Sequence, residues 1–253
     1  MDLFDLSGRI AVVTGGNRGI GLGISKGLAN AGATVVIVNR KAAEGQSAAE
    51  SLREDGLSAV AVPADVTSTS SINQMVAKVI GDLGRIDILV NNTGVLVKKP
   101  VVEISEEDWD YVINTNLKAV FFCCQTVGRE MIKNNRGRII NISSNVSSRQ
   151  QPLRSVYATS KAGLNNLTRA LAQEWGSYNI NVNVLAPSVT ITDMNKKYFL
   201  EEHPEALEEY LRLTPKGRVA YPGDYVGAAV FLASDASDYV TGQILFVDGG
   251  LTL

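Results

Sequence analysis

The feature that most constrains the fold is a regular alternation, along the whole chain, of short apolar runs and longer segments with helical periodicity. The apolar runs are rich in β-branched residues, and most are bounded by Gly, Asn, Asp or Pro. They lack polar alternation, which is typical of strands buried on both faces of a sheet. The runs lie at residues 10–13, 35–38, 59–62, 86–90, 139–142, 182–185 and 244–247, and the clearest helical segments lie at 20–31, 43–54, 71–83, 109–133 and 156–175.

Seven strands alternating with about six helices predict an α/β fold, namely a doubly wound, Rossmann-type parallel sheet with helices on both faces. Right-handed crossovers follow from the handedness of such connections. The sequence has no linker, low-complexity segment or break in composition, so residues 1–253 are expected to form a single domain. For the acidic stretch 190–218 we expect a helical lid over a site, with a solvated surface helix as the alternative.

Composition excludes several classes of protein. With 24 basic and 26 acidic residues the net charge is −2, which disfavours nucleic-acid binding through a bulk electrostatic field. No apolar run approaches the ~18 residues of a membrane helix, and the N-terminus does not resemble a signal peptide. The two cysteines are adjacent and the only histidine is His203, so we expect neither disulfides nor a metal site. We therefore expect a cytoplasmic protein without a nucleic-acid or membrane partner.

A glycine-rich turn connects the first predicted strand to the first predicted helix. Gly15, Gly19 and Gly21 have the spacing G-x-x-x-G-x-G, which permits a tight turn and a close approach of the backbone to a pyrophosphate. The N-terminus of the helix adds unpaired N–H groups and the positive end of its dipole. The turn therefore predicts a dinucleotide site, to which Asn17, Arg18 and Ile20 of the same turn would also contribute.

The end of the second predicted strand indicates which dinucleotide is preferred. An acidic residue there, roughly 20 residues after the glycines, would bind the ribose 2′-hydroxyl of NAD. This chain has Asn39 and Arg40 instead, and Arg18 lies inside the glycine turn. Two guanidinium groups without a carboxylate match a 2′-phosphate, so we expect NADP(H) rather than NAD(H). The alternative is that both arginines only solvate loops.

A Tyr-x-x-x-Lys pair, Tyr157 and Lys161, opens the last long helical segment. The two side chains lie one helical turn apart, so the ammonium is expected to lower the phenol pKa from its usual ~10. Tyr157 would then serve as the acid in ketone reduction or the base in alcohol oxidation. Ser144 follows the fifth predicted strand, at the end where parallel sheets place their sites, and its hydroxyl could hold the substrate oxygen.

Six ordered motifs of the chain resemble those of the short-chain dehydrogenase/reductase family over essentially its whole length. The glycine turn is one of them, and the segment Asp248-Gly249-Gly250 is another. The resemblance implies a catalytic tetrad and further cofactor contacts. The tetrad would be Asn116, Ser144, Tyr157 and Lys161, and the contacts would be Asp65, Val66, Asn92, Thr93, Gly94, Pro187, Ser188, Val189 and Thr192, besides Tyr157 and Lys161.

The resemblance also implies a reaction, in which a secondary alcohol and a ketone are interconverted by hydride transfer. Tyr157 would protonate the oxygen, Ser144 would orient it, and Lys161 would lower the Tyr157 pKa and bind the nicotinamide ribose. Asn116 would hold a water near Lys161. Two motif positions, Thr93 and Ser188, depart from the family's alanine and glycine. A serine forced to positive φ would cost of order 1 kcal/mol.

The loop before the tyrosine carries the polar residues Arg149, Gln151 and Arg154, which suit a carboxylate or polyhydroxy substrate. The alternative is that they face solvent or a neighbouring subunit. The pattern of the whole chain also resembles the family's sugar-acid branch, which includes gluconate 5-dehydrogenase and 2-deoxy-D-gluconate 3-dehydrogenase. We therefore expect a small polar substrate such as a sugar acid or polyol.

Three alternatives remain open. A 3-oxoacyl-carrier-protein reductase would dock its acidic carrier through arginines, but the matching positions here are Asn135 and Tyr178. A non-catalytic dinucleotide sensor would not need Tyr157 and Lys161 together, and a purely structural oligomer would need neither turn nor tetrad. Segments 109–133 and 156–175 are apolar around much of their circumference, so we expect them to be buried, in part against a second subunit. The family resemblance implies that these helices assemble a homotetramer, with a dimer as the alternative.

Overall fold

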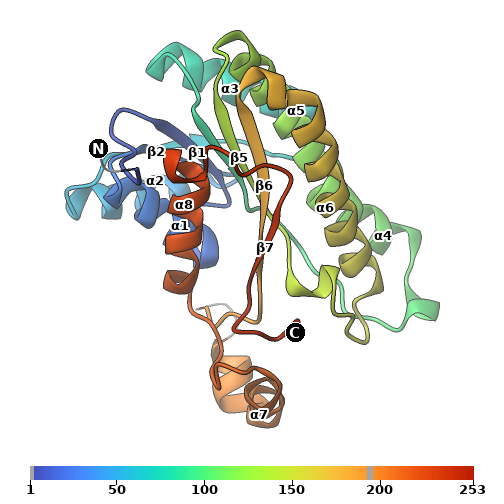
Figure 1. Cartoon of the computed structure of the whole chain (residues 1–253). Helices are drawn as coiled ribbons and strands as arrows, with labels where there is room; N and C mark the ends of the chain where they lie inside the picture. The colour runs from blue at the N-terminus through green and yellow to red at the C-terminus, as the bar shows by residue number, and fades with distance from the viewer. Residues whose placement is uncertain (1–2, 193–195) are drawn as a thin grey trace.

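β-Branched and other apolar residues make up most of each strand of a parallel sheet, which crosses the centre of the molecule (Figure 1). The computed structural model describes residues 3–192 and 196–253, and within these ranges the sheet has seven strands in the order β3-β2-β1-β4-β5-β6-β7. The predicted fold class is therefore confirmed. The strands are β1 (Ile10–Thr14), β2 (Thr34–Asn39), β3 (Ala59–Pro63), β4 (Ile88–Asn91), β5 (Gly137–Ile142), β6 (Ile180–Pro187) and β7 (Ile244–Val247).

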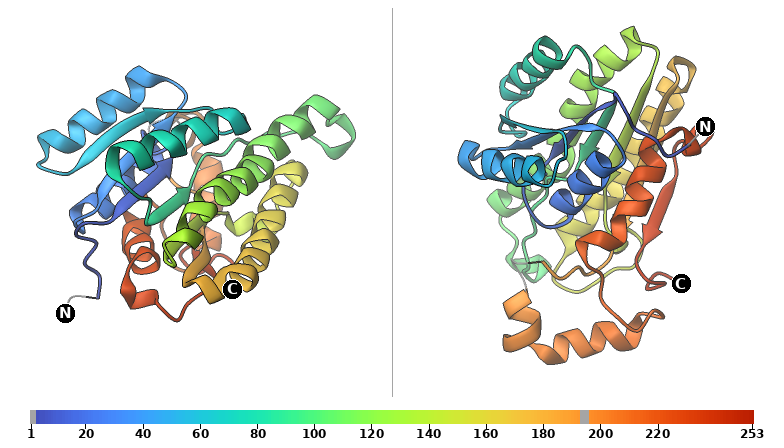
Figure 2. Two further views of the ribbon diagram at one scale, coloured as in Figure 1. Left: turned by 90° about the horizontal axis from the view of Figure 1, so that it is seen from above. Right: turned by 90° about the vertical axis from the view of Figure 1, so that its left-hand side faces the viewer.

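Successive residues of a strand face opposite sides of the sheet, so the sheet has two cores. Val12 belongs to the core under one helix layer, and its neighbour Val13 belongs to the core under the other. Figures 1 and 2 show the helices on the two faces. One layer contains α1 (Gly19–Asn30), α2 (Ala42–Glu54) and α8 (Val226–Ala233), and the other contains α3 (Thr69–Leu83), α5 (Ala119–Lys133) and α6 (Ser155–Trp175).

The predicted helical segment 109–133 contains a feature that its periodicity does not show. It begins earlier, as α4 (Glu106–Ile113), and Asn114–Lys118 form a π-helical turn before α5. A π turn inserts one extra residue into the helix and releases main-chain carbonyl groups, and such turns occur frequently at functional sites. Asn116, predicted as a tetrad member, lies in this turn.

The insertion at 190–218 contains helix α7 (Pro204–Leu213), preceded by a π-helical turn at Tyr198–Glu202. Helix α7 lies beyond the carboxyl ends of the strands in Figures 1 and 2. Residues 193–195 of the predicted lid lie outside the described residues. Among the helices that the structure describes, none has the length and apolar character needed to cross a bilayer.

Candidate active site

The glycine turn between β1 and α1 depends on glycine at three positions. Gly15 and Gly19 have φ angles of +64° and +54°, a region that L side chains rarely adopt. A Cβ at Gly21 would collide with the carbonyl oxygen of Gly15. No side chain caps the N-terminus of α1 and no acidic residue lies in its first turn. The turn is therefore a backbone cradle of the kind that accepts a pyrophosphate.

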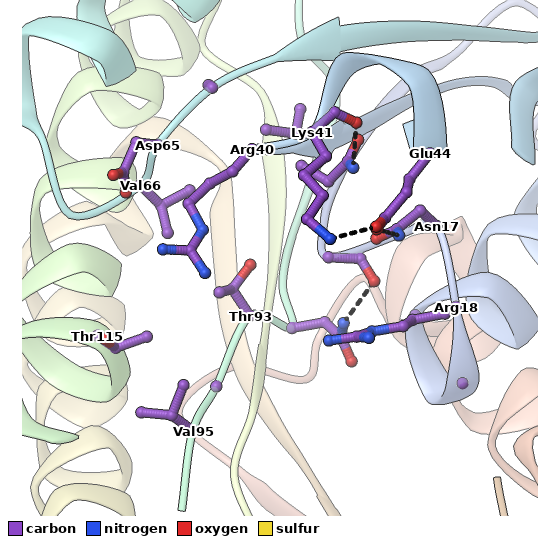
Figure 3. Close-up of a pocket in the computed structure, with 18 of the residues that line it drawn as sticks. Asn17, Arg18, Arg40, Lys41, Glu44, Asp65, Val66, Thr93, Val95 and Thr115 are labelled. Atoms are coloured by element: carbon purple, nitrogen blue, oxygen red, sulfur yellow. Dashed lines mark hydrogen bonds and ion pairs between the residues drawn. The ribbon is translucent and has the colours of Figure 1, made fainter. Parts of the chain in front are cut away.

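A cavity of about 460 Å³ extends from this turn along the carboxyl ends of β1, β2 and β4 (Figure 3). Three cationic side chains border it, those of Arg18, Arg40 and Lys41. Asp65, one of the predicted cofactor contacts, accepts hydrogen bonds from Thr67 (Oγ1 2.7 Å, N 2.9 Å), which together with the Arg40 charge hold its pKa below the usual range. The predicted cofactor residues that line this cavity are Gly15, Asn17, Arg18, Gly19, Ile20, Gly21, Asn39, Arg40, Asp65, Val66, Asn92, Thr93, Gly94 and Thr192.

A second cavity, of about 510 Å³, shares Arg18, Asn92 and Gly94 with the first, so the two form one cleft. Besides residues of the glycine turn, the loop after β4 and α4, its lining brings together residues at the ends of β5 and β6 and in the first turns of α6. The predicted site residues that line it are Arg18, Ile20, Asn92, Gly94, Ser144, Tyr157, Lys161, Pro187 and Ser188. Val189 and Asn116 line neither cavity.

Lys161 is buried, with 4% of its surface exposed, and its Nζ donates a 2.8 Å hydrogen bond to the carbonyl of Ile142. Nζ lies 5.7 Å from the centroid of the Tyr157 ring. Burial lowers the pKa of Lys161 to about 8, because the charged ammonium is poorly solvated there.

The expectation that Lys161 lowers the pKa of Tyr157 is wrong for this structure. The Tyr157 pKa is raised, because burial of the phenol outweighs the opposing effects of the Ser144 hydrogen bond and the Arg154 charge. Since the hydroxyl keeps its proton at neutral pH, the side chain is suited to donate that proton to a ketone.

The side chain of Asn116 is fully buried and links two segments of the site. Its Oδ1 accepts from the Val95 N–H (2.8 Å), and its Nδ2 donates to the Val95 carbonyl (2.9 Å) and to Ser160 Oγ (3.1 Å). Both N–H groups of the Asn116 side chain therefore already donate hydrogen bonds. To hold the predicted water near Lys161, this turn would have to accept a hydrogen bond from the water through one of its oxygen atoms. The side chain itself fixes the loop after β4 against α6.

The two departures from the family motifs cause no backbone strain. Ser188 is not among the described non-glycine residues with positive φ, so the strain considered for a serine here does not arise. The adjoining Thr190 hydroxyl contacts the Ser188 carbonyl (2.9 Å) and the Tyr225 hydroxyl (2.6 Å), which anchors the segment after β6. Thr93 donates its N–H to Thr14 Oγ1 (3.2 Å) and borders the first cavity.

The three polar residues predicted to contact substrate already have partners within the chain. Arg149 donates to the carbonyl of Leu251 (2.7 Å). Gln151 accepts from the Tyr210 hydroxyl (3.0 Å), and Arg154 donates to the same hydroxyl (3.2 Å). Tyr210 belongs to α7, so Gln151 and Arg154 connect the loop before α6 to the predicted lid.

Sequence reasoning missed a cation at this end of the cleft. The pKa of Lys98 is lowered by partial burial of its ammonium and by the positive charge of Arg154, so these two cations lie near each other. Arg154 also acts on the pKa of Tyr157. Lys98 follows the loop at the carboxyl end of β4, and the rule that placed Ser144 at such an end could have identified it.

A doubly wound sheet, with a glycine cradle at one end of a cleft and Ser, Tyr and Lys at the other, defines a nicotinamide-dependent oxidoreductase. A family model described as enoyl-(acyl carrier protein) reductase matches residues 15–252. The chain is 43% identical to gluconate 5-dehydrogenase of Gluconobacter oxydans, over 100% of this chain and 98% of that protein. It is 42% identical to 3-oxoacyl-(acyl-carrier-protein) reductase of Chlamydia trachomatis, over 97% and 98% of the two chains.

A solved structure of gluconate 5-dehydrogenase from Burkholderia cenocepacia, in complex with NADP and tartrate, superposes with a TM-score of 0.95. It is 38% identical and covers 99% of this chain and 98% of that chain. The chain belongs to the short-chain dehydrogenase/reductase family. The predicted family, oxidoreductase class and use of a nicotinamide dinucleotide are thereby confirmed.

Proposed function

We propose that the protein interconverts a sugar acid and its keto acid with NADP(H), as an oxidoreductase of the gluconate 5-dehydrogenase type. The observation that carries the proposal is the 43% identity to gluconate 5-dehydrogenase along the whole chain, with Ser144, Tyr157 and Lys161 gathered on one cavity. Two cations outside the lining of that cavity, Lys98 and Arg154, support an acidic substrate. Arg154 lies close enough to both Lys98 and Tyr157 for its charge to act on their pKa values. A substrate whose ketone meets Tyr157 would bring an attached carboxylate towards these cations, which bind carboxylates strongly when partly desolvated.

The cofactor end supports the choice of NADP(H). When bound, the cofactor supplies or accepts the hydride. The glycine cradle and the N-terminus of α1 would hold its pyrophosphate, while Arg18 and Arg40 would hold the 2′-phosphate, with Lys41 as a further cation that sequence reasoning did not identify. The choice of NADP(H) is supported by the structural relative that was solved in complex with NADP.

The chain's own residues would carry the proton chemistry. Tyr157 keeps its proton at neutral pH and would donate it to the ketone oxygen. Ser144 is 9% exposed, borders the same cavity, and would orient that oxygen by hydrogen bonding. Lys161, close to its own pKa at neutral pH, would bind ribose hydroxyls and supply positive charge as the proton leaves.

The test is NADPH oxidation by purified protein with 5-keto-D-gluconate and with an acetoacetyl thioester, followed by identification of the product. We expect rapid turnover of the keto acid, formation of gluconate, and slow turnover of the thioester. The Tyr157→Phe variant provides the blank. If only the thioester is reduced, the proposal is wrong.

Reduction of a 3-oxoacyl thioester is the second candidate, favoured by the 42% identity to the Chlamydia reductase. One argument against this candidate is that the two positions matching the carrier-docking arginines of such enzymes are Asn135 and Tyr178 here, and neither side chain is basic. The insertion between β6 and α8 also carries Glu201, Glu205 and Glu208, which would repel an acidic carrier protein.

We also propose that the protein is a homotetramer assembled through its long helices. Trp109 and Phe121 are 44% and 41% exposed, although both are large apolar side chains on the helical segments that lead from α4 into α5. Exposed aromatic side chains are enriched at interfaces between subunits. Sedimentation equilibrium would measure the mass directly.

A further inference from the structure

The adenosine end of the cleft contains two carboxylates, Asp65 and Glu44, among its cations, and Asp65 already accepts hydrogen bonds from Thr67. Figure 3 shows the Lys41 and Asn17 side chains turned towards Glu44, while Arg18 and Arg40 extend over the same pocket. Glu44 lies in the first turn of α2, just beyond the end of β2, where the 2′-phosphate of the cofactor is expected.

Glu44 links the two segments that flank this pocket. Its Oε1 lies 2.8 Å from Lys41 Nζ, and its Oε2 accepts a 3.2 Å hydrogen bond from Asn17 Nδ2. Lys41 precedes α2 and Asn17 belongs to the glycine turn. The hydrogen bond from Lys41 and the charges of Lys41 and Arg18 hold the Glu44 pKa below its usual range, so the carboxylate is ionised at neutral pH.

We propose that Glu44 determines cofactor specificity, as an internal anion that competes with the 2′-phosphate for Lys41 and Asn17. The inference rests on the proposed preference for NADP(H). A 2′-phosphate carries a charge near −2 and would be repelled by the carboxylate as well as deprived of two donors. The 2′-hydroxyl of NAD(H) carries no charge and is not repelled. Glu44 therefore weakens the binding of NADP(H) selectively and reduces the difference in affinity between NADP(H) and NAD(H).

The effect on the fold is expected to be small. Lys41 and Glu44 are 77% and 44% exposed as side chains, and ion pairs this exposed contribute little to stability. Replacing Glu44 by the isosteric glutamine should therefore change ligand binding without unfolding α2. Glu50 provides a matched control, because it lies on the same helix, is similarly exposed, and interacts with Gln46 and Arg53 of that helix.

The experiment measures calorimetric dissociation constants of 2′,5′-ADP and 5′-AMP, which differ only by the 2′-phosphate, for wild type, Glu44→Gln and Glu50→Gln. At about 50 mM NaCl we expect Glu44→Gln to bind 2′,5′-ADP about three- to tenfold more tightly than wild type. The gain should shrink at about 0.5 M NaCl because salt screens the repulsion. Binding of 5′-AMP by Glu44→Gln, and of both ligands by Glu50→Gln, should stay within about twofold of wild type.

Unchanged or weaker binding of 2′,5′-ADP by Glu44→Gln would overturn the inference, because Glu44 would then only position Lys41 and Asn17. The wild-type measurement tests the proposed cofactor separately. If wild type binds 5′-AMP as tightly as 2′,5′-ADP while Glu44→Gln prefers 2′,5′-ADP, the inference stands and the NADP(H) preference is wrong.

Discussion

The two ends of the cleft are built in different ways. The adenosine end is built around the main-chain cradle of the turn between β1 and α1, and the loops directly after β2, β3 and β4 complete it. The substrate end is formed by side chains from the ends of β5 and β6 and from α6, and the loop after β4, the loop before α6 and helix α7 meet beside it. A site made from local backbone leaves a motif in the sequence, whereas a site made from distant side chains leaves only scattered polar residues.

The largest expected effect separates chemistry from binding. Tyr157→Phe removes the acidic hydroxyl and should lower kcat by about 10²–10⁴-fold. Because the glycine cradle is untouched, the NADPH dissociation constant from fluorescence titration should stay within about twofold. Unchanged turnover would remove Tyr157 from the chemistry and favour another proton donor.

The next prediction concerns the substrate end alone. Lys98→Met should raise KM for 5-keto-D-gluconate by about 10–100-fold, because a charge-assisted contact to the carboxylate is lost. L-Sorbose, in which a hydroxymethyl group replaces the carboxylate, should show no such change. Lys99→Met is the matched control, since the Lys99 ammonium pairs with Asp108 (2.5 Å). Equal effects of the two variants on the keto acid would contradict a specific role for Lys98.

The backbone cradle has its own matched pair of variants. Gly21→Ala places a Cβ against the Gly15 carbonyl and should weaken NADPH binding about tenfold or more, with a loss of about 1–3 kcal/mol in the free energy of unfolding. Gly81→Ala, on α3, has open space around its Cβ and should stabilise the protein by about 0.5–1 kcal/mol. Calorimetric melting and NADPH titration of both variants would check this. Full NADPH affinity in Gly21→Ala would contradict the close approach assigned to this turn.

The last prediction concerns stability rather than binding, and involves the buried ammonium of Lys161 at the substrate end of the cleft. Burial lowers the Lys161 pKa to about 8, so the unfolded chain binds more protons than the folded protein from about pH 8 to 10.5. This group therefore makes the wild type more stable as pH rises through that window. Lys161→Met should be inactive yet about 1–3 kcal/mol more stable at pH 7, less any loss from the unpaired Ile142 carbonyl.

Urea unfolding of wild type and Lys161→Met between pH 7 and pH 10 would measure this difference. The gap in the free energy of unfolding should close as pH rises. A gap that stays constant with pH would show that the Lys161 ammonium is not strained by burial.

The contrast between the two ends also explains what the sequence could predict. The alternation of apolar runs predicts the sheet, because a strand buried on both faces can be identified from its own apolar residues, without knowing which residues pack against it. Gly15, Gly19 and Gly21 predict the cradle for a similar reason, since each residue is required by local backbone geometry. The approach of Lys98 to Arg154 depends on two loops more than 50 residues apart, so no local pattern contains it.

The direction of the Tyr157 pKa shift also could not be predicted from local sequence. Spacing places Lys161 one helical turn away but says nothing about how much water the phenol loses, and that loss determines the direction of the shift. The π turn at Asn114–Lys118 is likewise invisible to a periodicity of 3.6 residues.

The central claim is that the cleft binds an anion at each end, a 2′-phosphate and a substrate carboxylate. The most direct test is kcat/KM for two substrates, 5-keto-D-gluconate and L-sorbose, each with NADPH and with NADH. The account predicts the highest value for the keto acid with NADPH, and a separate loss of about tenfold or more when either anion is removed. Equal values for the keto acid and L-sorbose with NADPH would contradict the account at the substrate end, and equal values for NADPH and NADH would contradict it at the adenosine end.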